Sequence, residues 1–331
     1  MNEKKSIREK VGYSLGDVAA NLMFQILALL LMKLVADHFG LQTAIYVALA
    51  YVALLTFCHL SITPYFSKSR PVDTRQEMLT SLRSQSWRAV ALTMTVVTLA
   101  QSLRCATFGF YLYDYVDCQS LAAWLDGWTT VSATREEACA AGLFIFIAAA
   151  VVSQLAGIVL STRFFQRYGK KEMFVACLAL TALLSLTLYV PQPDDITLTL
   201  VLCVLKSLAF APAVPLLWAM TSDVADHVEH QHHRRTTGSC YAGVTFALKA
   251  GLGLGLFLAG LLLLVFGYAS DPSVLQSWTA VQGIRFASSV IPALLFVVGI
   301  MTLWSYPITK SYGERIQAEL TERRKIECIT Y

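Results

Sequence analysis

The segment Thr221 to Gly238, TSDVADHVEHQHHRRTTG, concentrates side chains that could do chemistry. It holds four histidines, three acids and two arginines in eighteen positions. His227 and His230 are three residues apart, and His233 follows at the same spacing, so on a helix these imidazoles could bind zinc or copper. The segment offers no open catalytic arrangement with a matched base. Metal binding is therefore retained only as a minor alternative.

A second group of polar side chains interrupts long apolar runs. Asp17 and Asn21 are four residues apart, which places them on one face of a helix. Charged side chains inside membrane spans usually face a cavity or a partner. We favour a lined cavity for Arg104 and for Lys249, which the glycine-rich run GLGLG follows. For Lys206, snorkelling to the surface or pairing for structure is an equal alternative.

The composition of the chain indicates the solvent in which these side chains lie. Of the 331 residues, 56% are hydrophobic and only 15% are charged, which is typical of an all-α polytopic membrane protein. A spanning helix needs roughly 20 mostly apolar residues. Eight segments qualify, at approximately 13–36, 45–65, 89–113, 141–162, 173–190, 197–220, 240–267 and 284–306.

Lysine and arginine predict the orientation of these helices. With the N-terminus in the cytoplasm, nearly all basic residues outside the spans fall in inside segments, and the outside loops hold only Arg135. This predicts a multi-pass protein of the inner membrane with both termini in the cytoplasm. The net charge of +4 then reflects orientation and does not require nucleic-acid binding. No nucleophile triad, phosphate loop or dinucleotide fingerprint is present, so the chain is not expected to be an enzyme.

The segments between the spans carry three further predictions. Cys118 and Cys139 both fall in the outside loop 114–140, where they could form a disulfide or remain free. The amphipathic stretch 73–88 is expected to lie on the inner membrane surface as a linker. Residues Gly313 to Lys325 are expected to form a charged, solvated helix.

Several motifs resemble those of one transporter family. The opening REKVGYSLGDVAANLMFQ, Arg8 to Gln25, is similar to the first helix of the glycoside–pentoside–hexuronide:cation symporters, the melibiose-permease-like branch of the major facilitator superfamily. The loop RYGKKE, Arg167 to Glu172, resembles the same family, and with the TGSCYAGVTFALK run it is most similar to the sulfoquinovose-type members. The family signature D-x-x-D-Y-G-E-W-K-T-G-x-R-x-x-G is matched without a gap by Asp223, Asp226, Glu229, Arg235 and Gly238, with Trp218 before it and Lys249 after it.

The chain also departs from the family pattern. His230 stands where the signature has tryptophan, and His232 and His233 stand where it has threonine and glycine. The family has about twelve spans, whereas this sequence offers eight. The segment Ile45 to Val72 resembles the sixth span, which implies that one block of about four spans is absent. Alternatively it is the fourth span, with two separate losses.

The resemblance implies a division of the chain and a function. We expect a reduced helix pair at 1–72, a linker at 73–88, a six-helix C-terminal half at 89–306 and a cytoplasmic tail at 307–331. The family function implied is symport of a small-molecule sugar or glycoside with sodium or a proton, by alternating access and without another cofactor. The family site implies that Asp17, Asn21, Arg104, Trp218 and Lys249 contact the sugar. The signature residues are expected to form a cytoplasmic gating loop, whose acids pair with Arg235 or with Arg167 and its neighbours when the cytoplasmic side closes.

Two alternatives to symport remain. The chain could be a degenerate, non-transporting member of the family, in membrane lipid, that self-associates to cover exposed helix faces. The histidines of the signature segment allow the metal-binding alternative. Within a gate, they could make transport pH-sensitive, because histidine titrates near neutrality.

Overall fold

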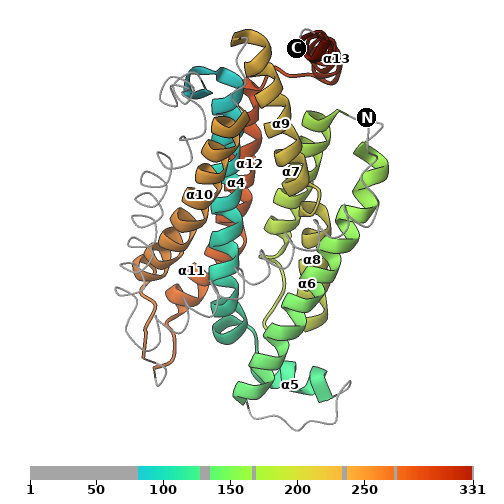
Figure 1. The fold of residues 1–331 in the computed structure, drawn as a ribbon. Coiled ribbons are helices and arrows are strands. Elements are labelled where there is room, and N and C mark those ends of the chain that lie inside the picture. The colour runs from blue at the N-terminus through green and yellow to red at the C-terminus, as the bar shows by residue number, and fades with distance from the viewer. Residues whose placement is uncertain (1–80, 127–134, 166–168, 233–236, 272–273, 330–331) are drawn as a thin grey trace.

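The computed structural model describes residues 81–126, 135–165, 169–232, 237–271 and 274–329. The two predicted spans at 13–36 and 45–65, with Asp17 and Asn21, lie outside the described residues, as do His233 and Arg235. The described residues form helices and connecting turns without strands (Figure 1). The elements are α4 (Gln85–Phe110), the π-helical turn η2 (Tyr111–Tyr115), α5 (Cys118–Asp126), α6 (Arg135–Phe165), α7 (Lys170–Thr187), α8 (Ile196–Phe210), α9 (Ala213–His232), α10 (Thr237–Val265), α11 (Trp278–Ser288), α12 (Val290–Thr302), the 3₁₀ turn η3 (Leu303–Ser305) and α13 (Lys310–Ile329).

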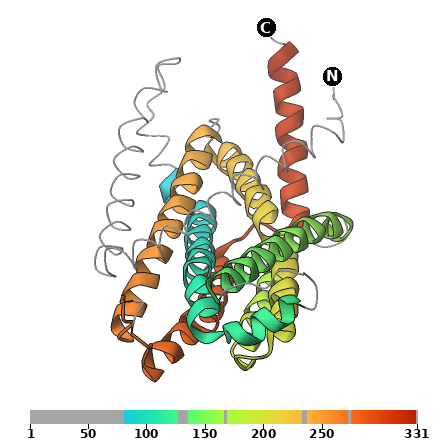
Figure 2. The same ribbon diagram turned by 90° about the horizontal axis from the view of Figure 1, so that it is seen from below.

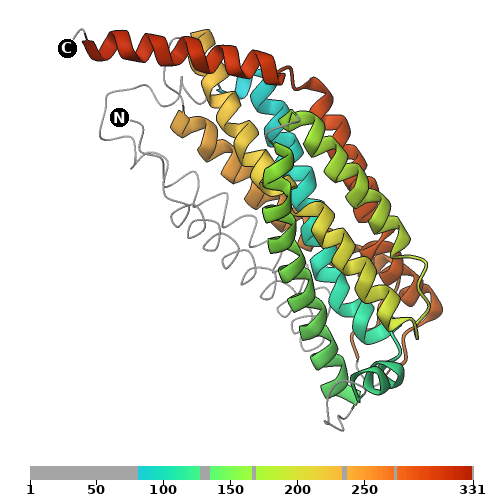
Figure 3. The ribbon, with the colours of Figure 1, turned by 90° about the vertical axis from the view of Figure 1, so that its right-hand side faces the viewer.

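These helices confirm the predicted class of all-α polytopic membrane protein. Among the described residues, five helical segments are long and apolar enough to cross a membrane: Gln85–Tyr115, Ala141–Ser161, Ile196–His232, Thr237–Val265 and Trp278–Ser305. The shorter α7 runs beside them and begins with the charged triplet Lys170–Glu172 (Figure 3). Large apolar side chains on the outside of the bundle, such as Phe144 and Val159 on α6, are exposed. This outer surface suits contact with lipid.

Helix α4 lies at the centre of the bundle, between α10 and α12 (Figure 1). Most of its side chains are buried. It approaches α10 closely because Gly251 and Gly255 present no side chain at the contact. Three hydroxyl groups of α4 donate across this contact to backbone carbonyls of α10: Thr95 to Ala247 (3.2 Å), Thr98 to Leu248 (3.3 Å) and Ser102 to Leu252 (2.8 Å).

Two of the spans are interrupted by breaks whose causes lie in the local sequence. The α8–α9 span turns at Ala211 and Pro212, where proline cannot supply a backbone N–H. The α11–α12 span breaks at Ser289, whose side-chain hydroxyl donates to the Arg285 carbonyl at 2.5 Å. Pro292 follows in the first turn of α12 and removes another helical donor. Each interrupted span therefore remains one crossing of the bundle with a bend inside it.

The end of the bundle that carries α5 is closed by aromatic and polar contacts. The Tyr115 hydroxyl donates to the Pro191 carbonyl at 2.6 Å. The Arg285 guanidinium lies 4.5 Å from the Tyr115 ring centroid and 4.3 Å from that of Tyr189, and it donates to the Tyr189 carbonyl at 2.6 Å. These contacts connect α11, η2 and the α7–α8 loop. Cys139, near the start of α6, is disulfide-bonded, and the helix that begins at Cys118 packs against α6.

The opposite end, called here the tail end, differs from the sequence-based expectation in three places. The linker expected at 73–88 overlaps α4, because Trp87 is buried against α10 and donates to the Cys240 carbonyl at 3.3 Å. The span expected to end at 220 continues to His232. The tail helix α13 is not simply solvated: it lies across α9, with Ile316 and Leu320 buried one turn apart (Figures 2 and 3).

Candidate functional site

The signature acids lie on a helix, so the interpretation of this part of the segment as a loop is wrong. Asp223, Asp226 and Glu229 all fall within α9. The helix continues past the apolar run because Val224, Ala225 and Val228 share a buried face that packs into the core. The polar side chains occupy positions between these apolar ones.

Asp223 forms the ion pair that anchors this part of α9. Its side chain is only 9% exposed, and Lys170 Nζ lies 2.7 Å from both of its carboxylate oxygens. Lys170 is the first residue of α7 and belongs to the RYGKKE motif. The pair therefore joins α7 and α9 within the described bundle.

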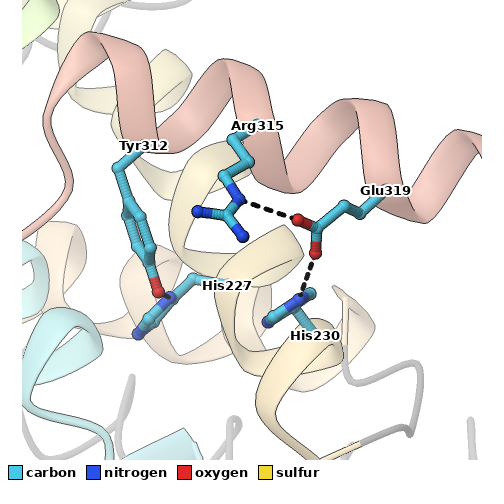
Figure 4. Close-up of polar contacts among 5 residues, drawn as sticks. All are labelled: His227, His230, Tyr312, Arg315 and Glu319. Atoms are coloured by element: carbon cyan, nitrogen blue, oxygen red, sulfur yellow. Dashed lines mark hydrogen bonds and ion pairs between the residues drawn. The ribbon is translucent and has the colours of Figure 1, made fainter.

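The histidines of the same segment contact the tail helix (Figure 4). His230 Nε2 lies 2.9 Å from Glu319 Oε2, and the other oxygen of Glu319 accepts from Arg315 Nε at 2.9 Å. The Tyr312 hydroxyl and His227 Nδ1 are 3.4 Å apart, and their rings meet edge to face. Within the described part of the chain, no group of three or more His, Cys, Asp or Glu residues could hold a metal ion. In this structure the two described histidines at metal-ligand spacing serve helix docking.

The pKa of the Glu319 carboxyl group depends on this contact. The hydrogen bond from Arg315, followed by that from His230, lowers the pKa of Glu319 below its ordinary value. Because the pKa of Glu319 is lowered in the docked structure, its charged carboxylate stabilises docking at pH values above the ordinary carboxyl pKa. That contribution is lost as the pH falls through the lowered value.

We therefore expect Glu319→Gln to loosen α13 from α9. Limited proteolysis of the tail at pH 6 should become about two- to fivefold faster, the range expected for losing an exposed ion pair. Glu322→Gln is the matched control, because Glu322 is exposed on the same helix and makes none of these contacts. Equal cleavage rates for wild type and Glu319→Gln would show that these ion pairs do not hold the tail.

A polar cavity of about 470 Å³ lies beside this docking contact. Its lining includes His227, Gln231 and Tyr312, together with the residues that begin α4. It opens at the tail end of the bundle and is separate from the mid-span charged residues. The cavity therefore belongs to the junction between the bundle and its tail.

The predicted sugar-contacting residues are spread along the bundle. Trp218 on α9 stacks on Tyr241 of α10, with ring centroids 6.2 Å apart and an interplanar angle of 6°. Lys249 is half-buried two turns further along α10. Gly238, the second residue of α10, has open space around it, since a Cβ there would meet nothing within 4 Å. The helix contact between α9 and α10 thus brings Trp218 close to the start of the helix that carries Lys249.

Arg104 lies elsewhere, in the half of α4 that approaches α5. It is buried and interacts electrostatically with Lys206 of α8. Trp218 stacks on Tyr241, whereas α4 meets α10 at Leu103, beside Arg104, at the level of Gly255, which is about 21 Å further along α10. One small sugar ring therefore cannot contact Arg104 and Trp218 directly at the same time.

Of the alternatives left open for Lys206, snorkelling to the surface is excluded. Its side chain is 2% exposed, so it does not snorkel to the surface, and its ring contact is with Phe296 of α12 at 5.7 Å. No acid among the described residues pairs with it. The signal available in the sequence was a single lysine inside the apolar run TLVLCVLKSLAF.

Comparison with known proteins identifies the family. The family model described as "MFS/sugar transport protein" matches residues 6–310. The chain is 29% identical over 168 residues to a protein of Escherichia coli (strain K12) named "Putative glycoside/cation symporter", covering 51% of this chain and 36% of that protein. It is also 29% identical over 178 residues to a "Putative sulfoquinovose importer" of the same strain, covering 53% and 37%.

A further relative in that strain is named "Glucuronide carrier protein homolog", with 23% identity over 187 residues, covering 55% of this chain and 40% of the relative. The matches thus span less than half the length of these curated relatives. The relatives are named as symporters, importers or carriers, and the family is one of transporters, not of enzymes. The chain belongs to the sugar-transport family of the major facilitator superfamily, among relatives that include glycoside/cation symporters.

Proposed function

We propose that this protein transports a small sugar or glycoside across the inner membrane together with a cation, by alternating access. The observation that carries the proposal is the family match, which runs along residues 6–310. Sodium or a proton is the proposed coupling ion. In this mechanism two groups of helices rock about a site near the middle of the membrane and expose it to each side in turn.

The distribution of charge supports a cytoplasmic location for the tail end. Basic side chains gather there, on the first turns of α4 and α7 and on α13, including Arg88, Lys171 and Arg323. Acids such as Asp117 and Asp194 lie in the connections at the opposite end. Lysine and arginine are retained on the cytoplasmic side of membrane proteins. We therefore propose that both termini lie in the cytoplasm.

The proposed sugar site combines residues from several helices. Trp218 offers an aromatic face to a sugar ring, and Lys249 offers a charge at the boundary between sugar and cation. Asp17 and Asn21 are proposed to bind hydroxyl groups, and Arg104 to line the same pathway further along α4. Asp223, Asp226, Glu229, Arg235 and Gly238 are proposed to stabilise the closed state of the cytoplasmic side. The Lys170–Asp223 pair supports that role within one half of the transporter.

Counterflow in reconstituted vesicles tests the proposal. Vesicles loaded with unlabelled methyl β-D-glucoside or methyl β-D-glucuronide should take up the radiolabelled form of the same sugar transiently. A chain that folds but shows no counterflow with a wider glycoside panel would be the non-transporting, self-associating family member instead. Native mass spectrometry of the same preparation would then report whether copies associate.

Lys249→Ala should reduce counterflow of the transported sugar at least about tenfold, the effect of losing a charge-assisted contact to a bound ligand. Initial rates in vesicles with matched protein content provide the measurement. Arg83→Ala is the control, because Arg83 is exposed at the tail end. Unchanged uptake by Lys249→Ala would remove this lysine from the site.

A further inference from the structure

The polar cavity of about 470 Å³ lies where three helices meet at the tail end of the bundle. The start of α4, the last two turns of α9 and the start of α13 line it. The polar side chains in its lining include Ser84, Ser86, His227, Gln231, Thr309 and Tyr312. None of the described residues that line it is an acid. A cavity of this size can hold a small organic molecule, and the exposed Gln231 and Thr309 show that solutes can reach it.

Two long helices begin at this cavity, α4 with 26 residues and α13 with 20. The first amide groups of a helix have no acceptor inside the helix, and the helix dipole gives that end a partial positive charge. Ser84 precedes α4, but its side chain makes no cap hydrogen bond. Thr309 precedes α13, and its hydroxyl lies 3.4 Å from that of Ser311. Helix N-termini are common binding sites for phosphate groups.

Two buried polar side chains in the lining have donors to spare. Ser86 is 2% exposed, and its hydroxyl forms no hydrogen bond with any described residue. His227 is 6% exposed; its Nδ1 faces the Tyr312 hydroxyl, and the other ring nitrogen points away from Tyr312 (Figure 4). When the Tyr312 hydroxyl donates to Nδ1, the neutral ring carries its proton on Nε2 and can donate to a ligand. Buried polar groups are normally hydrogen-bonded, so these two side chains call for an acceptor inside the cavity.

The charges around the cavity favour an anion as that acceptor. Arg83 and Lys310 each stand next in sequence to a lining residue, on α4 and α13 respectively. Glu319, the acid of the neighbouring docking contact, is paired with Arg315 and His230. A phosphate group has several acceptor oxygens, so it can accept hydrogen bonds from donors on three helices at once. The volume of the cavity leaves room for the rest of a molecule that carries such a group.

We propose that this cavity binds a phosphate group carried by a small organic molecule, and that the bound phosphate holds α13 against α4 and α9. Ser86 and His227 donate to the phosphate oxygens from inside the cavity, and the start of α4 adds its amide groups. A soluble phosphate ester and the head group of a phospholipid share this chemistry. The site lies at the tail end, apart from Trp218 and Lys249, and does not depend on the proposed sugar transport.

Glycerol 3-phosphate is the soluble probe, because it carries the phosphate without a sugar ring. Added to the purified, delipidated full chain in detergent, it should raise the melting temperature, and calorimetric titration gives its affinity. At ten times the dissociation constant it should also slow limited proteolysis of the tail about tenfold, since the ligand stabilises the docked form. Sodium chloride at the same ionic strength is the control. Equal stabilisation by sodium chloride would be a general salt effect and would overturn the proposal.

Variants of two lining residues locate the binding. Ser86→Ala should weaken it at least about tenfold, because it removes a buried donor to a charged group. Without ligand the same variant should melt like wild type, and a clear drop would show that the hydroxyl is structural and overturn the proposal. Gln231→Glu places a negative charge at the cavity and should weaken binding at least about fivefold. Gln317→Glu is the matched control, the same change at an exposed position of α13 outside the lining, and equal losses in both variants would contradict the site.

A lipid probe separates the two sources of the phosphate. Dioleoylphosphatidic acid is added to the same delipidated protein, with dioleoylglycerol, which lacks the phosphate, as its control. Stabilisation by the phosphatidic acid alone, lost in Gln231→Glu, would assign the site to a phospholipid head group. Stabilisation by glycerol 3-phosphate, lost in the same variant, would assign it to a soluble phosphate ester. Binding of neither probe to monodisperse protein would overturn the proposal, and sugar counterflow by that protein would leave the transport function standing.

Discussion

Gly255→Leu will prevent α4 and α10 from packing, and little monodisperse protein will be recovered from membranes. A Cβ at position 255 would lie 2.6 Å from the Leu99 carbonyl oxygen and 3.0 Å from the Leu103 amide nitrogen. Both atoms belong to the backbone of the central helix, so neither can move aside without shifting α4. A leucine extends three carbon atoms beyond that position.

Gly255→Ala should produce a milder form of the same steric conflict with α4, so that the protein can still be purified and its stability measured. Overpacking of a tight contact typically costs about 1–3 kcal/mol, so the melting temperature of the purified protein should fall clearly. Gly313→Ala is the matched control: its Cβ would lie 3.6 Å from Ile308 Cγ2, an ordinary contact, and alanine favours a helix over glycine. If Gly255→Ala were as stable as wild type, the close contact between α4 and α10 would not exist as described.

Lys170→Met is expected to destabilise the bundle by about 1–3 kcal/mol, because it leaves the Asp223 carboxylate buried without its partner. A fully buried pair would cost more to break, but Lys170 is 42% exposed and water reaches it. Asp223→Asn in the same background should restore most of the loss by removing the unpaired charge. Thermal unfolding of the two single variants and the double variant gives the coupling between the side chains.

The neighbouring lysine provides the control for this cycle. Lys171 Nζ donates to the Tyr306 carbonyl at 2.8 Å, so Lys171→Met removes a hydrogen bond without leaving a buried charge. Its cost should be smaller, about 0.5–1.5 kcal/mol. Equal losses for Lys170→Met and Lys171→Met, with no recovery in the double variant, would contradict the role given to the Asp223 pair.

The order of the spans in the described part of the chain could be predicted because each crossing is a long apolar run. The lengths of two of them could not. Hydropathy falls at Thr221, yet α9 continues to His232 because Val224 and Val228 maintain an apolar stripe that packs on α4 and α10. The first turn of α4 was missed in the sequence for the same reason, because polar residues surround Trp87. In both cases tertiary burial extends a helix that composition alone would end.

The candidate site was predicted less completely than the fold. Motif position drew attention to Trp218, Lys249 and the signature acids, and it named Arg167 and its neighbours as partners of those acids. It could not single out the pair of Lys170 with Asp223, because that contact joins residues 53 positions apart. The docking of α13 also depends on long-range contacts, with Ile316 and Leu320 spaced four apart in an otherwise charged helix. Lys206 required the structure, since only the positions of its neighbours show that no acid among the described residues pairs with it.

Gradient-driven accumulation tests the proposed coupling of sugar movement to a cation. Proteoliposomes containing the full chain would receive radiolabelled methyl β-D-glucuronide under an inward sodium gradient or, separately, an inward proton gradient. The internal sugar concentration should rise above the external one with one of these gradients, and an ionophore for that ion should abolish the excess. Sugar that only equilibrates under both gradients, or that does not enter vesicles holding folded protein, would contradict cation-coupled transport.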